Sequence, residues 1–235
     1  MQTGGLLGSG RSADVFAIDD RWVLRRYRDG GDVTAEAEVM AYLAEHGYPV
    51  PRLRGPAGAG GSTAPRTDLV MQRLHGPSML QALLQGVITA EEAGAGLADL
   101  LHRLHSVPAR VSADLVHRIL HLDLHPDNVM LTSGRPVVID WRNTEEGPPG
   151  LDWGMSALIL AQVAVGNTAL VELARAVLAS LLTHLSPAIT LGSTDSGYLA
   201  EARKRRAADP SMNESETHLL GEAIELILEL TSARP

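Results

Sequence analysis

Short apolar runs separated by turn residues open the chain. Two such runs lie between residues 6 and 18 on either side of a glycine-rich turn, and an alternating run follows over residues 21–27 after Asp19 and Asp20. Alternation bounded by glycine and aspartate predicts strands. A further apolar run, residues 68–74, follows residues 55–68, which are rich in Gly, Pro, Ala and Ser. These patterns predict a small antiparallel sheet with a loop joining two of its strands.

One helix is predicted beside this sheet. Residues 33–46 place Glu36, Val39, Met40 and Leu43 at positions i, i+3, i+4 and i+7, and the pattern stops at Gly47. Glu36 therefore shares the apolar face of the helix.

The second half of the chain has helical patterns. Thr89-x-x-Glu92 has the spacing of a capping box ahead of a leucine stripe, and residues 158–185 and 214–230 are each predicted as a helix. Residues 129–132 and 136–139 are β-rich around Ser133 and Gly134, which predicts a hairpin inside the helical part. The change of pattern predicts a first lobe at residues 1–71, a hinge at 72–76 and a helical lobe at 77–235.

Composition narrows the function. The chain has 235 residues, 45% of them hydrophobic, a net charge of -8 and no cysteine. This length and hydrophobic fraction allow the chain to bury a core as one large domain or two small lobes. Because the chain has no cysteine, it has no thiolate metal site. Its negative net charge disfavours nucleic acid as a general partner. Residues 153–171 are uncharged but interrupted by Gly and polar residues, so we expect a buried helix and no membrane partner. The N-terminus lacks the features of a signal peptide, and we expect a cytoplasmic protein. The sequence leaves the oligomeric state open.

The strongest chemical signal lies around the predicted hairpin. His121-Leu-Asp123-Leu-His125-Pro-Asp127-Asn128 precedes the hairpin, and Val138-Ile139-Asp140-Trp141 follows it. Because a hairpin returns the chain close to its start, we expect Asp140 to lie beside Asp123 and Asn128. Two carboxylates and a carboxamide are hard oxygen ligands suited to Mg²⁺.

These motifs resemble a known family. The order H-x-D-x-x-x-x-N, hairpin, Asp is similar to the catalytic set of the protein-kinase-like fold. HLDLHPDNVML, VVIDWRN and GPPGLDWG resemble the aminoglycoside phosphotransferase and choline kinase-like family. The resemblance implies an α+β, two-lobed protein-kinase-like fold, with a small antiparallel sheet and one helix in the N-lobe and a mainly helical C-lobe. It also implies an ATP-dependent kinase.

The resemblance assigns a reaction and its catalytic residues. Such an enzyme transfers the γ-phosphate of ATP or GTP, with Mg²⁺, to a hydroxyl of a small molecule such as an aminoglycoside, a sugar or an amino alcohol. Asp123 would accept or orient the proton of that hydroxyl, and Asn128 and Asp140 would hold Mg²⁺. His121 and Asp152 would support the catalytic loop structurally.

The resemblance also places a nucleotide site in the N-lobe. Gly8-Ser9-Gly10-Arg11-Ser12-Ala13-Asp14-Val15 fits G-x-G-x-x-A-x-V, a loop that covers phosphates through backbone N–H groups, and Val15 would cover the base. Arg25 stands where protein kinases have lysine, and Glu36 would be its ion-pair partner. Strand alternation alone does not decide between Arg25 and Arg26. Met71 would lie behind the base, with the Gln72 carbonyl and the Leu74 N–H binding its edge.

Other interpretations remain open at this point. A degenerate nucleotide-binding module without turnover fits Arg25 and Ala13, and a metal-dependent hydrolase could use His117, His121, Asp123 and His125. The acceptor is poorly constrained, because only twelve residues separate Pro108 from His121. Acidic residues could attract a cationic acceptor. These are Glu145, Glu146, Glu214, Glu216, Glu222, Glu225 and Glu229. The basic run at residues 201–206 is expected to be solvated surface.

Overall fold

The computed structural model describes residues 4–10, 13–54, 67–210 and 212–232. The chain divides into two compact units, Met1–Pro77 with Met130–Thr144, and Ser78–Val129 with Glu145–Pro235. Residues 130–144 group with the N-terminal unit because backbone hydrogen bonds tie them to it, from Leu131 N–H to the Pro77 oxygen at 2.9 Å and from Val138 N–H to the Pro49 oxygen at 2.8 Å. The predicted division at residues 72–76 assigns residues 130–144 to the helical lobe, whereas the structure groups them with the first unit.

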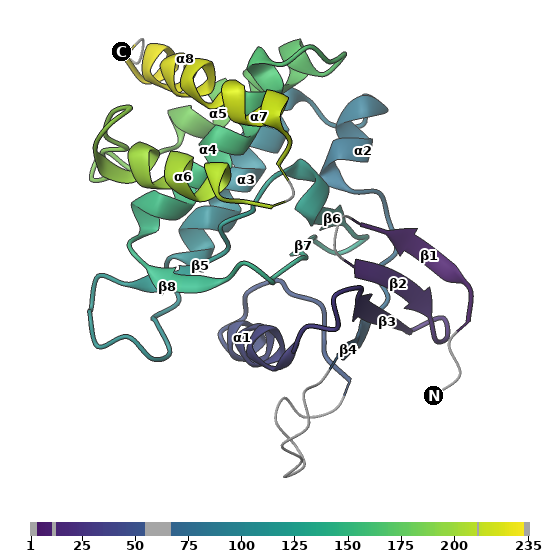
Figure 1. The fold of residues 1–235 in the computed structure, drawn as a ribbon. Helices are drawn as coiled ribbons and strands as arrows, with labels where there is room; N and C mark the ends of the chain where they lie inside the picture. The colour runs from purple at the N-terminus through teal and green to yellow at the C-terminus, as the bar shows by residue number, and fades with distance from the viewer. Residues whose placement is uncertain (1–3, 11–12, 55–66, 211, 233–235) are drawn as a thin grey trace. The chain divides into compact units, whose positions relative to one another are not determined.

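The first unit is built on a four-stranded antiparallel sheet in the order β1-β2-β3-β4 (Figure 1). Its elements are β1 (Leu6–Ser9), β2 (Ala13–Ala17), β3 (Trp22–Tyr27), β4 (Asp68–Gln72), α1 (Thr34–Glu45) and the hairpin strands β6 (Val129–Leu131) and β7 (Pro136–Val138). The register places Val15 opposite Arg25 and Val23 opposite Met71. The predicted strands, the helix and the hairpin are confirmed, whereas most of the predicted loop at residues 55–68 lies outside the described residues.

Helix α1 packs through the predicted face. Glu36, Ala37, Met40 and Leu43 are buried, and the helix ends at Glu45, with His46 as its C-cap, before Gly47, whose φ is 74°. A positive φ is the conformation that glycine adopts without a steric penalty, so the sequence stops the helix where the pattern predicted.

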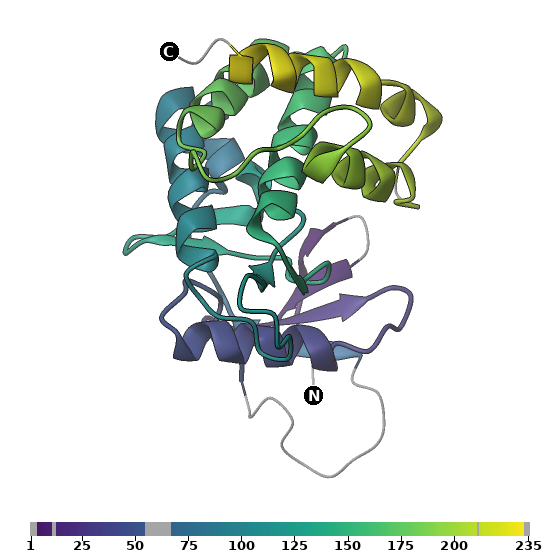
Figure 2. The same ribbon diagram turned by 90° about the vertical axis from the view of Figure 1, so that its left-hand side faces the viewer.

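The second unit is mainly helical. Its elements are α2 (Met79–Leu84), α3 (Ala90–Leu104), β5 (Arg118–Leu120), η1 (Pro126–Asn128), β8 (Glu145–Gly147), α4 (Pro149–Val165), α5 (Val171–Thr183), α6 (Gly197–Ala207), α7 (Glu214–His218) and α8 (Leu220–Ser232). Helix α5 packs against both α3 and α4, and α4 also contacts α6 and α8 (Figure 2). Helix α4 is therefore central to the core of this unit.

Helix α3 illustrates how the sequence builds this core. Thr89 and Glu92 form the predicted capping box, and the leucine stripe from Leu97 to Leu104 is fully buried. Gly94 lets α5 approach closely, because a Cβ at this position would lie 2.5 Å from Ser180 Cβ. The α3 prediction is thus confirmed in both its start and its buried face.

Two helix predictions are wrong in their continuity. Residues 158–185 form parts of two helices, because α4 starts at Pro149 and ends at Val165 before Gly166, and α5 begins at Val171. Likewise, α7 and α8 replace the single helix predicted at residues 214–230. Most of α4 is buried, as expected for a core helix. Within the described ranges, no helix combines the length and the apolar character needed to cross a membrane.

Candidate active site

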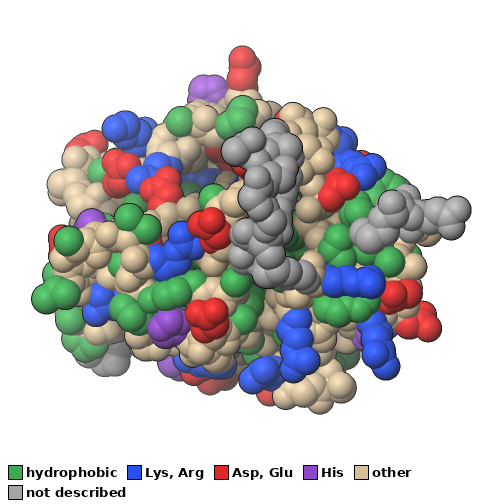
Figure 3. Space-filling model, turned by 90° about the horizontal axis from the view of Figure 1, so that it is seen from below, with side chains coloured by type: hydrophobic (Ala, Val, Ile, Leu, Met, Phe, Trp, Pro, Cys, Tyr) green, Lys and Arg blue, Asp and Glu red, His purple; other side chains and the backbone are tan. Residues whose placement is uncertain are grey.

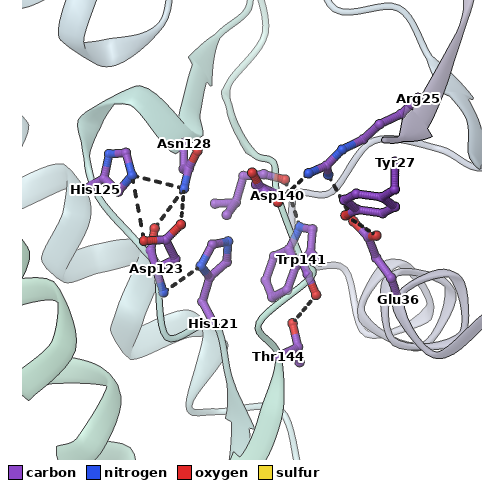
Figure 4. Close-up of polar contacts among 11 residues, drawn as sticks. Arg25, Tyr27, Glu36, His121, Asp123, His125, Asn128, Asp140, Trp141 and Thr144 are labelled. Atoms are coloured by element: carbon purple, nitrogen blue, oxygen red, sulfur yellow. Dashed lines mark hydrogen bonds and ion pairs between the residues drawn. The ribbon is translucent and has the colours of Figure 1, made fainter. Parts of the chain in front are cut away.

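The catalytic loop of the second unit runs from β5 to η1. His125 caps η1, since its side chain accepts a hydrogen bond from the Asp127 N–H, and Pro126 opens the turn. Asn128 Nδ2 donates to the Asp123 backbone oxygen at 2.8 Å and lies 3.3 Å from Asp123 Oδ2 (Figure 4). The amide nitrogen of Asn128 is thus committed to the loop, and among the described residues no group donates a hydrogen bond to its oxygen, which can act as a ligand.

Asp123 presents a carboxylate beside this amide. Its side chain is 25% exposed, and His125 Nε2 lies 3.9 Å from Asp123 Oδ1. Burial lowers the pKa of His125, against the opposing charge of Asp123. Lowering the pKa favours the neutral imidazole, so this site pairs an accessible carboxylate with an uncharged ring.

His121 has the structural position that was predicted for it. It is fully buried, and its Nδ1 accepts the Asp123 N–H at 3.2 Å. The Nδ1 atom of His121 is therefore engaged within the loop. Within the described part of the chain, no group of three or more His, Asp or Glu side chains has the geometry of a metal site.

Asp152 anchors the backbone of the loop. Its carboxylate is fully buried and accepts the His121 N–H at 2.9 Å and the Leu122 N–H at 2.7 Å. Although burial opposes it, hydrogen bonds and the charge of His105 lower the pKa of Asp152, with a contribution from the His121 N–H. The carboxylate is therefore ionised at neutral pH and serves as a fixed acceptor.

A second polar cluster lies in the first unit. Arg25 donates to Glu36 Oε1 at 3.0 Å and to Asp140 Oδ1, and Tyr27 donates to Glu36 Oε2 at 2.7 Å (Figure 4). Burial raises the pKa of Glu36, against the opposing effects of Arg25 and Tyr27. Asp140 has a φ of 66°, a left-handed conformation that is unusual for a residue with a Cβ. The cluster thus holds a carboxylate in a strained backbone position.

The structure distinguishes the two neighbouring arginines of β3. Arg25 is 7% exposed and faces Glu36, as its predicted ion pair requires. Arg26 is exposed on the opposite face and forms a two-bonded ion pair with Asp68. Sequence alternation could not decide which face is inward, because both faces of the strand carry apolar residues.

The glycine-rich segment connects β1 and β2. Gly8 and Ser9 lie in β1, Gly10 N–H donates to the Ala13 oxygen at 2.9 Å, and Val15 lies in β2, while Arg11 and Ser12 fall outside the described residues. Arg28 ties the two strands together, because it donates to the Gly10 oxygen at 2.6 Å and to Asp14 at 2.7 Å. This tie was not predicted, since Arg28 lies outside the motif.

The predicted hinge follows β4. Met71 is paired within the sheet, and Gln72 N–H donates to the Arg52 oxygen at 2.7 Å. In the described part of the chain, no group accepts a hydrogen bond from the Leu74 N–H. Gly76 has a φ of 134°, and a Cβ there would lie 2.1 Å from the Leu131 oxygen. The end of the hinge therefore requires glycine.

Several acidic candidates for acceptor binding are already engaged. Glu145 accepts from Arg205 at 2.7 Å, and Glu229 from Arg175 at 3.2 Å. Glu146 accepts the backbone N–H groups of residues 110–112 at 2.7–3.1 Å. Acidic and basic side chains also lie next to one another on the face shown in Figure 3. These three carboxylates are engaged within the second unit, and they give no evidence for a cationic acceptor.

The profile of the phosphotransferase enzyme family matches the chain over residues 3–118 and 109–188. The chain belongs to this family. Membership confirms the predicted resemblance and the enzyme class, an ATP-dependent phosphotransferase with an alcohol group as acceptor. No curated protein matches the chain significantly in sequence.

Solved structures show the fold of the chain. The amicoumacin kinase hAmiN, solved with AMP-PNP and Ca²⁺, has 13% sequence identity and a TM-score of 0.55, covering 97% of this chain and 88% of that one. The aminoglycoside phosphotransferase APH(2'')-Ib with ADP has 15% identity and a TM-score of 0.53, with coverages of 98% and 94%. A choline/ethanolamine kinase family protein from Mesorhizobium loti has 12% identity and a TM-score of 0.53, with coverages of 99% and 89%. The phosphotransferase thus has the predicted protein-kinase-like α+β fold.

The predicted site residues of this phosphotransferase fall into two groups. Asp123 and Asn128 are in contact within the second unit, and Arg25, Glu36 and Asp140 are in contact within the first. The predicted convergence of Asp140 with Asp123 and Asn128 joins residues of different units and stays a prediction. Sequence analysis did not identify His105, which bonds to Asp152, because a residue at the end of a helix belongs to no periodic pattern.

Proposed function

We propose that this phosphotransferase transfers the γ-phosphate of ATP or GTP to a hydroxyl group of a small molecule in a reaction that requires Mg²⁺. The observation that carries the proposal is the Asn128 amide, whose nitrogen is bound to the Asp123 backbone and whose oxygen accepts no hydrogen bond within the described residues. An accessible carboxylate on Asp123 lies directly beside it. This pairing of a proton acceptor with a ligand for a hard cation is what phosphoryl transfer needs.

Asp123 is the proposed catalytic base. The acceptor oxygen forms a bond to the γ-phosphorus while the bond from that phosphorus to the β–γ bridging oxygen breaks, and ADP or GDP leaves. The acceptor proton passes to the Asp123 carboxylate. Because the protein does little covalent chemistry in such a reaction, most of the rate comes from positioning and from neutralising phosphate charge.

The donor groups fit Mg²⁺. Asn128 Oδ1 and the Asp140 carboxylate are oxygen ligands of the kind that this cation prefers, and we propose that they hold it. Bound Mg²⁺ would neutralise negative charge on the phosphates. Asp140 is an ion-pair partner of Arg25 in the structure, and this contact orients its carboxylate.

The first unit supplies the proposed nucleotide contacts. Arg25, held by Glu36, would bind the α and β phosphates through its planar fork. The segment Gly8, Ser9, Gly10, Arg11 and Ser12 would cover the phosphates. Val15 and Met71 would contact the base, and the Gln72 carbonyl and the Leu74 N–H would bind its edge.

The acceptor is proposed at the level of its class. Aminoglycosides, sugars and amino alcohols all carry a hydroxyl that the Asp123 carboxylate could deprotonate. The acidic residues around β8 are bound to other parts of the second unit, so they do not favour the cationic members of this group.

Thermal unfolding with Mg·ATP and Mg·GTP tests the nucleotide site. A ligand at 100-fold its dissociation constant stabilises a protein by about 2.7 kcal/mol, which raises the Tm measurably. We expect a Mg²⁺-dependent rise for the natural chain that Asp140→Asn removes, while the exposed control Asp20→Asn retains it. An equal rise in Asp140→Asn, or no rise at millimolar nucleotide, would contradict the proposal.

Acceptor-dependent release of ADP tests the catalytic step. Asp123→Asn should keep the nucleotide-induced rise in Tm and lose turnover, because the variant retains the nucleotide contacts but has no base. Nucleotide binding without turnover across a panel of aminoglycosides, sugars and amino alcohols would instead identify a degenerate nucleotide-binding module.

A further inference from the structure

His105 connects three segments of the second unit. It lies at the end of α3, its ring Nε2 is 3.0 Å from Asp152 Oδ2 on α4, and its backbone oxygen accepts a hydrogen bond from Arg118 Nε on β5 at 3.0 Å. The side chains of His105 and Asp152 are 7% and 0% exposed. Because the Asp152 oxygen can only accept, the ring nitrogen facing it carries the hydrogen.

Asp152 transmits this connection to the catalytic loop. Its two oxygens accept the N–H groups of His121 and Leu122, the residues just before Asp123. Leu122 has a φ of 61°. A residue with a Cβ stays in this left-handed conformation only where surrounding contacts hold it there. The position of the Asp152 carboxylate therefore determines the backbone path into Asp123.

The backbone bonds alone do not orient this carboxylate. Both N–H donors belong to the catalytic loop, so with these two bonds alone the side chain of Asp152 could rotate with the loop, although its backbone is fixed in α4. In the described residues, His105 is the only donor to Asp152 from outside the loop. The last turns of α3, just before His105, are held in the core by fully buried leucines such as Leu101 and Leu104. Through Asp152, His105 thus connects a second buried helix, besides α4, to the loop.

We propose that His105 is a positioning residue for phosphoryl transfer, which orients Asp152 and through it the backbone that carries Asp123. The inference rests on the proposed function, because it takes Asp123 as the group that receives the acceptor proton. His105 does not touch the reacting atoms, so its effect falls on the rate of the chemical step and leaves nucleotide binding largely unchanged.

The test compares His105→Gln with His105→Met. Glutamine places an N–H donor at about the reach of the imidazole Nε2, whereas methionine has similar length and volume and no donor. The kcat for ADP release should fall about tenfold to hundredfold in His105→Met, since a displacement of about 1 Å can cost that much. The KM for Mg·ATP should change little, and His105→Gln should retain a kcat close to that of the natural chain.

The assay conditions ensure that unfolding of a variant is not mistaken for a loss of kcat. Each variant is assayed well below its own Tm, with Mg·ATP and a panel of aminoglycosides, sugars and amino alcohols, and with water alone as acceptor. If the natural chain releases no more ADP than Asp123→Asn, the proposed function itself fails. If the natural chain is active and His105→Met retains its kcat, or both variants lose kcat equally, only the role of His105 is overturned.

Discussion

Replacing Arg25 with methionine leaves the Glu36 carboxylate buried without its cation. The side chains of Arg25 and Glu36 are 8% and 5% exposed, and their ion pair measures 3.0 Å. Tyr27 still donates to Glu36, but a hydroxyl does not compensate for a lost guanidinium. We therefore expect Arg25→Met to destabilise the first unit strongly.

The size of this effect is limited by protonation of Glu36. Removing one partner of a buried ion pair costs about 3–5 kcal/mol. The carboxyl can instead take up a proton, and from its ordinary pKa of 4.5 this costs about 3 kcal/mol at pH 7 and about 1 kcal/mol at pH 5.5. The loss in free energy of unfolding should therefore be about 3 kcal/mol at pH 7 and close to 1 kcal/mol at pH 5.5.

The sign of the pH dependence follows from the pKa of Glu36. Burial raises this pKa, and Arg25 opposes the rise. Removing Arg25 raises it further, so Glu36 of the folded variant stays protonated to a higher pH. A group with a raised pKa in the folded state stabilises below its unfolded pKa and loses that contribution as the pH rises, so the deficit of the variant grows with pH.

Urea unfolding at pH 7 and pH 5.5, followed by circular dichroism, measures these free energies. Adding Glu36→Gln to Arg25→Met removes the buried charge, so the double variant should be more stable than Arg25→Met at pH 7. Arg26→Met is the matched control, because Arg26 is half exposed and its pair with Asp68 contributes at most about 1 kcal/mol.

Three results would refute this reasoning. The first is an equal loss for Arg25→Met at both pH values. The second is a double variant no more stable than Arg25→Met, which would show that the charge of Glu36 is not the source of the cost. The third is a loss in Arg26→Met as large as that in Arg25→Met.

Three further predictions concern the second unit. Gly94→Ala should lower the free energy of unfolding by about 1–3 kcal/mol, because its Cβ would lie 2.6 Å from the Val177 oxygen, whereas Gly96→Ala in the same helix should be neutral or stabilising, which urea unfolding of the two variants would show. Asp152 has a lowered pKa in the folded state, so its contribution to stability is present above its ordinary pKa and is lost as the pH falls through the folded pKa. Asp152→Asn should therefore be less stable than the natural chain at pH 7. In urea titrations, it should also lose less free energy of unfolding than the natural chain between pH 5 and pH 3. Glu146→Gln should speed amide hydrogen exchange at residues 110–112 while exchange in α3 is unchanged, and equal exchange in that loop would exclude the anchoring role of Glu146.

Local patterns determined most of the elements of this protein. The strands β1 to β4, the hairpin, α1 and the capped helix α3 follow from periodicity, caps and turn residues, which act within a few positions of the chain. The order of motifs around Asp123 and Asp140 also identified the family, because the chemistry requires particular residue types in a particular order. The break between α4 and α5 was missed, since apolar residues continue on both sides of Gly166 and periodicity weakens where a helix is buried on every face.

The tertiary structure decided which side chains meet. Only the packing of α1 against the sheet selects Arg25 over Arg26, and only the fold brings Glu145 to Arg205, 60 residues away. The same holds for His105 and Asp152, which lie 47 residues apart and join through a buried contact. A sequence pattern reports which face of an element is apolar, but the partner of a buried polar group depends on how separate elements pack. The amino-acid sequence therefore determined the elements and the chemistry, and the tertiary structure decided the contacts that hold and position them.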